Sequence, residues 1–298
     1  MNKIAEQIKK IRKAAMEPFE IRKCVNKIRV AKNSMVNEVI DELIAIGPDK
    51  AVPHLVKLLK DENNTVRLNG IIALGKIKSQ SAVPHLIELV DDKVWFIREH
   101  AMSALGKLAS EKAIPHLIRR MRDVSWSCTQ AAGDALGMIK SEKAVPSLIE
   151  LLNDKNFNVR LNAAKALGEI GSEKAIPYLV ERIKDSVRDV RSSSVNSIGK
   201  IGTYTAIKEL IKLVKEDDGY VRAPAIKIVE EYLKRFENER ADPASKVPIP
   251  FALSHINPFE HPKSFVQLIE AAEKGKKKSN KHWKLTAKQL IAMERKFK

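Results

Sequence analysis

The sequence has few of the residue patterns from which catalytic and metal sites are built. Among its 298 residues are two cysteines and seven histidines, and they do not follow the paired spacings of zinc sites. It has neither a glycine-rich phosphate-binding loop nor the motif of a nucleophile elbow. We therefore expect no metal ion or cofactor, and we expect a binding protein rather than an enzyme.

Long apolar segments are absent as well. No run approaches the roughly 18 apolar residues of a membrane-spanning helix, and the N-terminus lacks the apolar core of a secretion signal. Cys24 and Cys128 occupy positions that are otherwise apolar, which predicts buried, unreactive thiols rather than a disulfide. We expect a monomeric protein of the reducing cytoplasm without a transmembrane segment.

One segment of the chain recurs at a fixed interval. Its copies read AVPHLVKLL, AVPHLIELV, AIPHLIRRM, AVPSLIELL, AIPYLVERI and AIKELIKLV, and each begins 31 residues after the previous one. The copies begin at Ala51, Ala82, Ala113, Ala144, Ala175 and Ala206. A period of this length is typical of stacked supersecondary units. It predicts an all-α fold, an α-solenoid of about seven two-helix repeats.

The aligned copies predict two helices in every repeat. The first helix has apolar residues at i, i+3 and i+4 and a proline in its first turn, where a missing N–H costs least. These prolines are Pro53, Pro84, Pro115, Pro146 and Pro177. An acidic turn follows, with Asp61, Asp92, Asp123, Asp154, Asp185 and Glu216. The second helix is expected to open at Val66, Ile97, Cys128, Val159, Val190 and Val221.

A column of glycines lies within the second helices. Glycine inside a helix costs roughly 1 kcal/mol relative to alanine. Five copies in one column therefore predict the close approach of a neighbouring helix. The glycines are Gly75, Gly106, Gly137, Gly168 and Gly199.

These columns together resemble the HEAT-like repeats of phycobilin lyase subunits. The resemblance covers residues 51 to about 236 and implies that the second helices line the concave side of a superhelix. It also implies that an arginine column forms a hydrogen-bonded ladder with turn aspartates of neighbouring repeats; a track of phosphate-binding arginines is the alternative. The column contains Arg67, Arg98, Arg160, Arg191 and Arg222, with Thr129 as its gap.

We expect three regions along the chain. Residues 1–19 form a basic amphipathic helix, residues 20–236 form the repeats, of which the first and last are degenerate, and residues 237–298 combine a proline-containing extended segment with a basic helical tail. The net charge of +17 is concentrated at the two ends. Basic ends suit an acidic partner such as nucleic acid, an anionic membrane or an acidic protein, and solubility is the alternative explanation.

A row of histidines is the first irregular feature of the repeats. His54, His85 and His116 each follow a repeat proline. Equivalent residues of adjacent repeats lie about 10 Å apart, whereas zinc ligands lie about 2 Å from one centre. We expect surface histidines rather than a metal site.

An aromatic row is the second irregular feature. Trp95, Trp126 and Phe157 occur one per repeat, in what we expect to be the turn before the second helix, although aromatic residues are only 5% of the chain. Tryptophan is favoured at binding hot spots, and aromatic rings can stack on bases. Packing of the turn against the next repeat is the alternative.

The repeat that begins at Ala113 departs most from the others. Asp134 replaces a residue typical of the other copies and is expected on the concave side. With Arg98, His100 and Arg160 it forms the place where we expect a specific contact.

Three functions fit these observations. The preferred hypothesis is a non-catalytic scaffold that binds another protein along its concave face through Trp95, Trp126, Phe157 and Asp134. The second is a nucleic-acid-binding protein that uses the basic tail, at Lys276, Lys277, Lys278, Lys281 and Trp283. The third, a lyase-like subunit that assists cofactor attachment to a client protein, is implied by the resemblance alone.

Overall fold

The computed structural model describes residues 18–30, 33–213, 216 and 218–241, and every regular element within them is helical. The all-α solenoid predicted from the 31-residue period is therefore confirmed. The chain divides into two compact units, Met1–Ser141 and Glu142–Lys298. The predicted N-terminal helix (residues 1–19) and the predicted tail (residues 237–298) lie outside the described residues, apart from residues 18–19 and 237–241.

The first unit holds the predicted degenerate repeat and three regular repeats. The degenerate repeat consists of helical residues 18–30 and α2 (Asn33–Ile46). The regular pairs are α3 (Pro48–Leu58) with α4 (Asn64–Ile77), α5 (Val83–Glu88) with α6 (Trp95–Lys107), and α7 (Ile114–Arg120) with α8 (Trp126–Ile139). Short 3-10 turns η1 (Gln80–Ala82), η2 (Leu89–Asp91) and η3 (Glu111–Ala113) connect them.

The second unit repeats the same plan. Its pairs are α9 (Val145–Leu151) with α10 (Phe157–Ile170), α11 (Ile176–Arg182) with α12 (Arg188–Ile201), and α13 (Tyr204–Leu213) with α14 (Gly219–Ala241). The 3-10 turns η4 (Glu142–Ala144) and η5 (Glu173–Ala175) precede α9 and α11. Helix α14 runs without interruption past residue 236, the expected end of the repeats.

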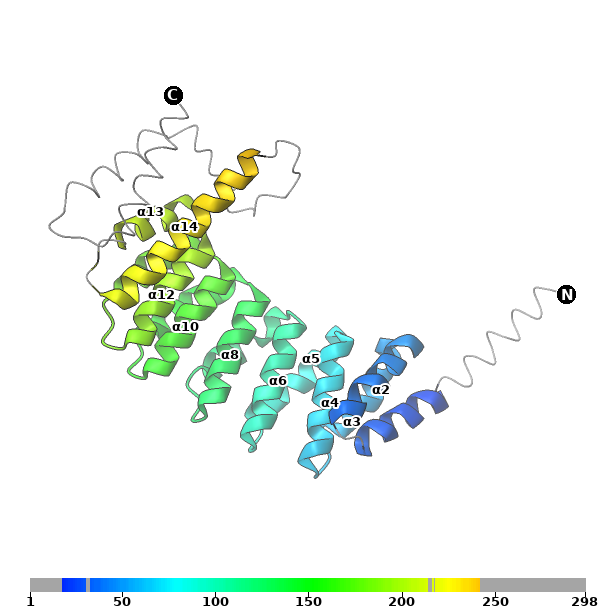
Figure 1. The fold of residues 1–298 in the computed structure, drawn as a ribbon. Coiled ribbons are helices and arrows are strands. Elements are labelled where there is room, and N and C mark those ends of the chain that lie inside the picture. Colours follow the sequence, from blue (N-terminus) through cyan, green and yellow to red (C-terminus); the bar gives the residue numbers. More distant parts are fainter. Residues whose placement is uncertain (1–17, 31–32, 214–215, 217, 242–298) are drawn as a thin grey trace. The chain divides into compact units, whose positions relative to one another are not determined.

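The second helices are the packed layer of each unit. Helix α6 lies between α4 and α8 in the first unit, and α12 lies between α10 and α14 in the second (Figure 1). Each first helix packs mainly against the second helix of its own repeat. The core between the two helices is filled by fully buried leucines such as Leu86, Leu105 and Leu117.

Glycine lets the second helices come together, as the glycine column predicted. A Cβ atom built on Gly106 would lie 2.8 Å from the Cα of Ala135 and 3.0 Å from its Cβ. In the second unit, a Cβ on Gly168 would lie 2.7 Å from the Cα of Ser197. The backbone atoms of Ala135 and Ser197 could move away only if the two packed helices separated. A side chain is therefore excluded at Gly106 and at Gly168.

The starts of the second helices differ from the prediction by two residues. The carboxylate of Asp92 accepts a hydrogen bond from the N–H of Val94 (2.8 Å), and Asp123 does the same for Ser125 (2.9 Å). These bonds close the turn, so the helix begins at the next residue. Trp95, Trp126 and Phe157 are therefore the first residues of α6, α8 and α10, and their predicted placement in the turn was wrong.

One predicted first helix also starts earlier than expected. Pro53 lies inside α3, because the helix begins at Pro48, directly after Gly47 with its left-handed φ of 148°. In α5, α7, α9 and α11 the repeat proline lies in the first turn, as predicted.

A serine–carboxylate ladder joins the repeats at the opposite end from the acidic turns. Ser79 donates a hydrogen bond to Asp49 (2.6 Å) and Ser141 to Glu111 (2.6 Å). Within the second unit, Ser172 donates to Glu142 (3.0 Å). The sequence analysis did not identify this ladder, because the paired residues lie 30 positions apart along the chain.

Substitution of Gly106 tests the packed layer. Alanine favours helices over glycine by about 1 kcal/mol, but its methyl group would clash with Ala135 and overpacking costs about 1–3 kcal/mol. We expect Gly106→Ala to lower the free energy of unfolding, measured by urea denaturation. Gly219→Ala is the control, since no atom lies within 4 Å of its Cβ position. Equal or higher stability of Gly106→Ala would contradict this packing.

Candidate functional site

Two tryptophans expose their rings at adjacent helix starts of the first unit. Trp95 begins α6 and Trp126 begins α8, and 49% and 57% of their surfaces are exposed. The two starts adjoin, because the thiol of Cys128 donates a hydrogen bond to the carbonyl of Trp95 (3.2 Å). The Trp95 ring also meets Phe96 edge to face, with 5.8 Å between ring centroids.

Val124 extends this apolar surface into the turn before α8. It is fully exposed, two residues before Trp126. Side chains at a helix start lean toward the N-terminus of that helix, so each indole is expected to lean toward the turn before its own helix. We call Trp95, Val124 and Trp126 the tryptophan patch.

The other predicted contact residues of the first unit lie farther along the helices. Asp134 is exposed on α8, eight residues after Trp126, which corresponds to about 12 Å along the helix axis. His100 is half-buried, with its Nδ1 2.7 Å from the carbonyl oxygen of Phe96. These two side chains therefore do not form one cluster with the tryptophan patch.

Arg98 belongs to the predicted ladder. Its guanidinium donates two hydrogen bonds to the buried carboxylate of Asp123 (2.9 and 2.8 Å) and one to the carbonyl of Asp92 (2.9 Å). Arg160 makes the same paired contact with Asp185 in the second unit (2.7 and 2.8 Å). Both arginines bind the turn aspartate of the next repeat and so link neighbouring repeats. The ladder implied by the family resemblance is therefore confirmed at these positions.

The ladder has a weaker pair and a shifted pair. Arg67 pairs with Asp92 at 3.4 Å. Arg191 of α12 pairs with Asp218 of the last repeat (2.6 Å) rather than with Glu216, the residue at the 31-residue spacing. Thr129 has no guanidinium, and its hydroxyl donates to carbonyls of its own repeat, those of Asp123 (3.3 Å) and Ser125 (3.4 Å).

The ladder changes the acidity of its carboxylates. Burial of Asp123 opposes its ionised form, but the hydrogen bonds from Arg98 and from the N–H of Ser125 hold its pKa below the ordinary value. Arg160 does the same for the pKa of Asp185.

The two thiols are buried and unpaired with each other, as predicted. Burial and the neighbouring carboxylate of Glu42 raise the pKa of Cys24 to about 11. Burial also raises the pKa of Cys128. Neither thiol is therefore activated as a nucleophile at neutral pH.

A basic cluster lies at the end of α7, and sequence reasoning missed it. Arg119 and Arg120 both form ion pairs with Asp91, and Arg120 also bonds Asp123 (3.1 Å). Partial desolvation of Asp91 opposes its ionised form, but these contacts hold its pKa below the ordinary value. The signal was present, because Arg120 stands in a column that is leucine in most repeats. The column holds Leu58, Leu89, Arg120, Leu151, Arg182 and Leu213.

The second unit carries its own exposed aromatic residues. Phe157 begins α10 and is 41% exposed. Tyr220, at the start of α14, lies under the guanidinium of Arg188 at 5.5 Å and accepts a hydrogen bond from it (3.2 Å).

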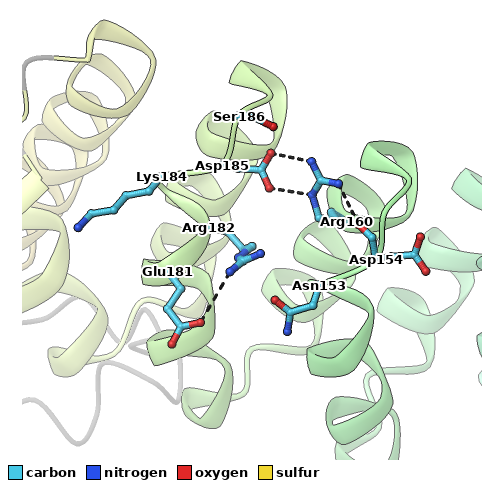
Figure 2. Close-up of a pocket in the computed structure, with 8 residues that line it drawn as sticks. All are labelled: Asn153, Asp154, Arg160, Glu181, Arg182, Lys184, Asp185 and Ser186. Atoms are coloured by element: carbon cyan, nitrogen blue, oxygen red, sulfur yellow. Dashed lines mark hydrogen bonds and ion pairs between the residues drawn. The ribbon is translucent and has the colours of Figure 1, made fainter.

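A cleft of about 430 Å³ opens between the turn that follows α9 and the turn that follows α11. Figure 2 shows Arg160 and Asp185 bound to each other across it, while Lys184 points away. Arg182 donates to the carbonyl of Leu152 (3.2 Å). The charges of the residues that line the cleft balance, and the pair of Arg160 and Asp185 belongs to the ladder. We therefore interpret the cleft as part of the contact between two repeats rather than as a ligand site.

Metal and membrane sites find no support in the described part of the chain. No group of three or more His, Cys, Asp or Glu side chains there could hold a metal ion. His54, His85 and His116 are half-buried on three separate helices. Among the same residues, no helix combines the length and apolarity needed to span a bilayer. The basic nucleic-acid candidates, Lys276, Lys277, Lys278, Lys281 and Trp283, lie outside the described residues.

Comparison with known proteins agrees with this architecture. A family model described as HEAT repeats matches residues 37–104, 52–136, 114–199 and 146–230, which is more than half of the chain. The chain belongs to the HEAT-repeat family. No curated protein matches this HEAT-repeat chain significantly.

Solved structures of repeat proteins are similar to it. One is the complex of CpcE and CpcF of phycocyanin lyase from Nostoc sp. PCC7120, with 20% identity, a TM-score of 0.47, and coverage of 82% of this chain and 94% of that one. Another is a designed armadillo repeat protein in complex with the peptide (KR)4, with 19% identity, a TM-score of 0.44, and coverage of 61% and 99%. At these identities the similarity concerns the fold alone.

Removal of a ladder carboxylate tests this account of Arg98. Because Asp123 and Arg98 are buried together, Asp123→Asn leaves a buried cation uncompensated and should cost about 3–5 kcal/mol of unfolding free energy at pH 7. The exposed Asp134→Asn is the control and should change little.

The pH dependence of this difference gives a second readout. The folded-state pKa of Asp123 lies below its unfolded value, so its stabilising effect is present at neutral pH and is lost as the pH falls through the folded value. The stability difference between wild type and Asp123→Asn, measured by urea denaturation, should therefore narrow in acid. Equal stabilities at pH 7 would contradict the structural role.

Proposed function

We propose that this HEAT-repeat protein is a non-catalytic scaffold that binds another protein through the tryptophan patch. The observation that carries the proposal is the exposure of two indole rings and a valine on adjacent repeats. Large apolar side chains are normally buried, and clusters of them on a surface mark interaction sites.

The energetics of association favour this surface. Burial of apolar area contributes about 25 cal/mol per Å², and an aromatic ring buries 150–250 Å² in favourable cases. Tryptophan has only two side-chain torsions to immobilise, so little entropy is lost when a partner covers it. Tryptophan is for these reasons enriched among residues that dominate binding energy.

The scaffold keeps the two rings at a defined separation. The close contact of Gly106 with Ala135 and the bonds of Arg98 with Asp123 join α6 and α8 rigidly. A partner therefore meets preorganised anchors, which lowers the cost of binding. Asp134 and His100 lie farther along the same helices, outside the tryptophan patch, and Phe157 is a separate exposed ring in the second unit.

Affinity capture from the native extract tests the proposal. The immobilised full chain, with the extract treated with nuclease, is expected to recover a defined protein, and Trp126→Ala should reduce that recovery at least tenfold because a hot-spot residue is lost. Tyr178→Ala is the matched control, since Tyr178 is an aromatic residue of the second unit with similar exposure, 42%.

Stability must be followed in parallel. Both variants should unfold at the wild-type urea concentration, because neither ring is buried in the core. If Trp126→Ala and Tyr178→Ala recover as much of the protein as wild type does, the patch is not the binding surface.

A further inference from the structure

We infer that the partner segment docking on the tryptophan patch is acidic, with apolar side chains that cover the indoles and carboxylates that meet the basic cluster beside Val124. This inference rests on the proposed function and adds the chemistry of the partner. The charges around the patch support it, and so does Val124, an exposed valine at a position that is polar or charged in the other repeats.

The ladder removes two carboxylates from consideration. Asp92 and Asp123 are paired with Arg67 and Arg98, and all four side chains are largely buried. They therefore offer little free charge to a ligand.

The remaining charged groups near Trp95 and Val124 carry more positive than negative charge. Arg119 and Arg120 lie at the end of α7, and they share the carboxylate of Asp91 at the surface. Lys93 adds an exposed cation two residues before Trp95, while Glu88 is exposed at the end of α5. The turn thus carries an excess of positive charge, on a chain whose net charge is +17. Such a field attracts acidic segments and repels basic ones.

Val124 favours a protein over a nucleic acid at this surface. Its column is polar or charged in the other repeats, which carry Glu62, Lys93, Lys155 and Ser186. A fully exposed valine can neither pair with nor donate a hydrogen bond to a phosphate group. An apolar side chain of a peptide, in contrast, can pack on Val124 and Trp126 together.

Two carboxylates limit how far an acidic segment can extend. Glu99 lies one helical turn beyond Trp95, and Asp134 lies two turns beyond Trp126. Each carboxylate lies farther from the turn before its helix, whereas the indoles are expected to lean toward these turns. An acidic segment is therefore expected to lie over the turn side of the patch, and removal of either carboxylate should not weaken it.

A displayed library of random twelve-residue peptides, panned against the full chain, tests the inference. Peptides that combine several Asp or Glu with aromatic or aliphatic residues should be enriched over a blank surface. A labelled, enriched peptide is then measured by fluorescence anisotropy. Trp126→Ala should raise its Kd at least tenfold, whereas Lys93→Glu and Arg119→Glu should each raise it several-fold, with the largest effect at low salt.

Matched variants separate the possible failures. Asp134→Asn and Lys112→Glu, an exposed lysine on η3 at the opposite end of the repeat, should leave the Kd unchanged. If enriched peptides are basic or neutral and are weakened by Asp134→Asn, the acidic partner is wrong while the binding patch stands. If enriched peptides bind Trp126→Ala as well as wild type, the proposed function itself fails at this surface.

The remaining outcomes also decide the matter. Enrichment of no peptide overturns the inference. A labelled oligo(dT) probe that competes with the enriched peptide and is lost in Trp126→Ala would assign the patch to single-stranded nucleic acid, and would overturn it as well. Wild-type thermal unfolding of each variant ensures that the changes in Kd report binding.

Discussion

The close approach of the second helices is the constraint on which the structure depends. The backbone of Gly106 lies so near Ala135 that no side chain fits between them, and Gly168 meets Ser197 in the same way. A single pair of helices of this size cannot bury enough surface to offset its own ordering entropy. Each repeat is therefore completed by its neighbour, and small residues at the contact allow the dense packing that this requires.

The turn aspartate couples this packing to the surface. Asp123 closes the turn by accepting the N–H of Ser125, and it also binds Arg98 from the preceding repeat. One carboxylate thus sets where α8 begins and how α6 lies beside it. Trp126 then stands at the first position of α8, where a side chain has few helical neighbours to pack against. Exposure of the indole follows from the geometry of the turn.

Periodicity made most of the fold predictable. A position that is apolar in all six copies is expected to be buried, and a position that is glycine in most copies is expected to contact a neighbouring helix. The burial of Leu105 and the helix contact at Gly106 could therefore be predicted from the sequence. The ladder of Arg98 and Asp123 could be inferred from the family pattern. The choice of Asp218 over Glu216 as the partner of Arg191 could not be inferred. Both residues lie in the same turn, and either pairing leaves the alignment of the helices between repeats unchanged.

The candidate site was less predictable than the fold. The aromatic row was visible in the sequence, but whether Trp95 and Trp126 pack on the next repeat or face solvent depends on hydrogen bonds that close the turn. The predicted contact place grouped Arg98 and Arg160 with Asp134, but both arginines bind turn aspartates. Arg120 and Val124 each differ in polarity from most residues at the equivalent positions of the other repeats. A comparison that looks only for residues shared by all repeats does not detect such exceptions.

The most direct test of this account is whether the two indoles of the tryptophan patch face water in the free protein. The chain has three tryptophans, so a Trp283→Phe variant leaves only Trp95 and Trp126 to report. Acrylamide quenching of its fluorescence should approach that of an exposed model indole, and emission should lie close to that of tryptophan in water. Shielded, blue-shifted emission that acrylamide hardly quenches would mean that the rings are already covered within the chain, and would contradict a free binding surface.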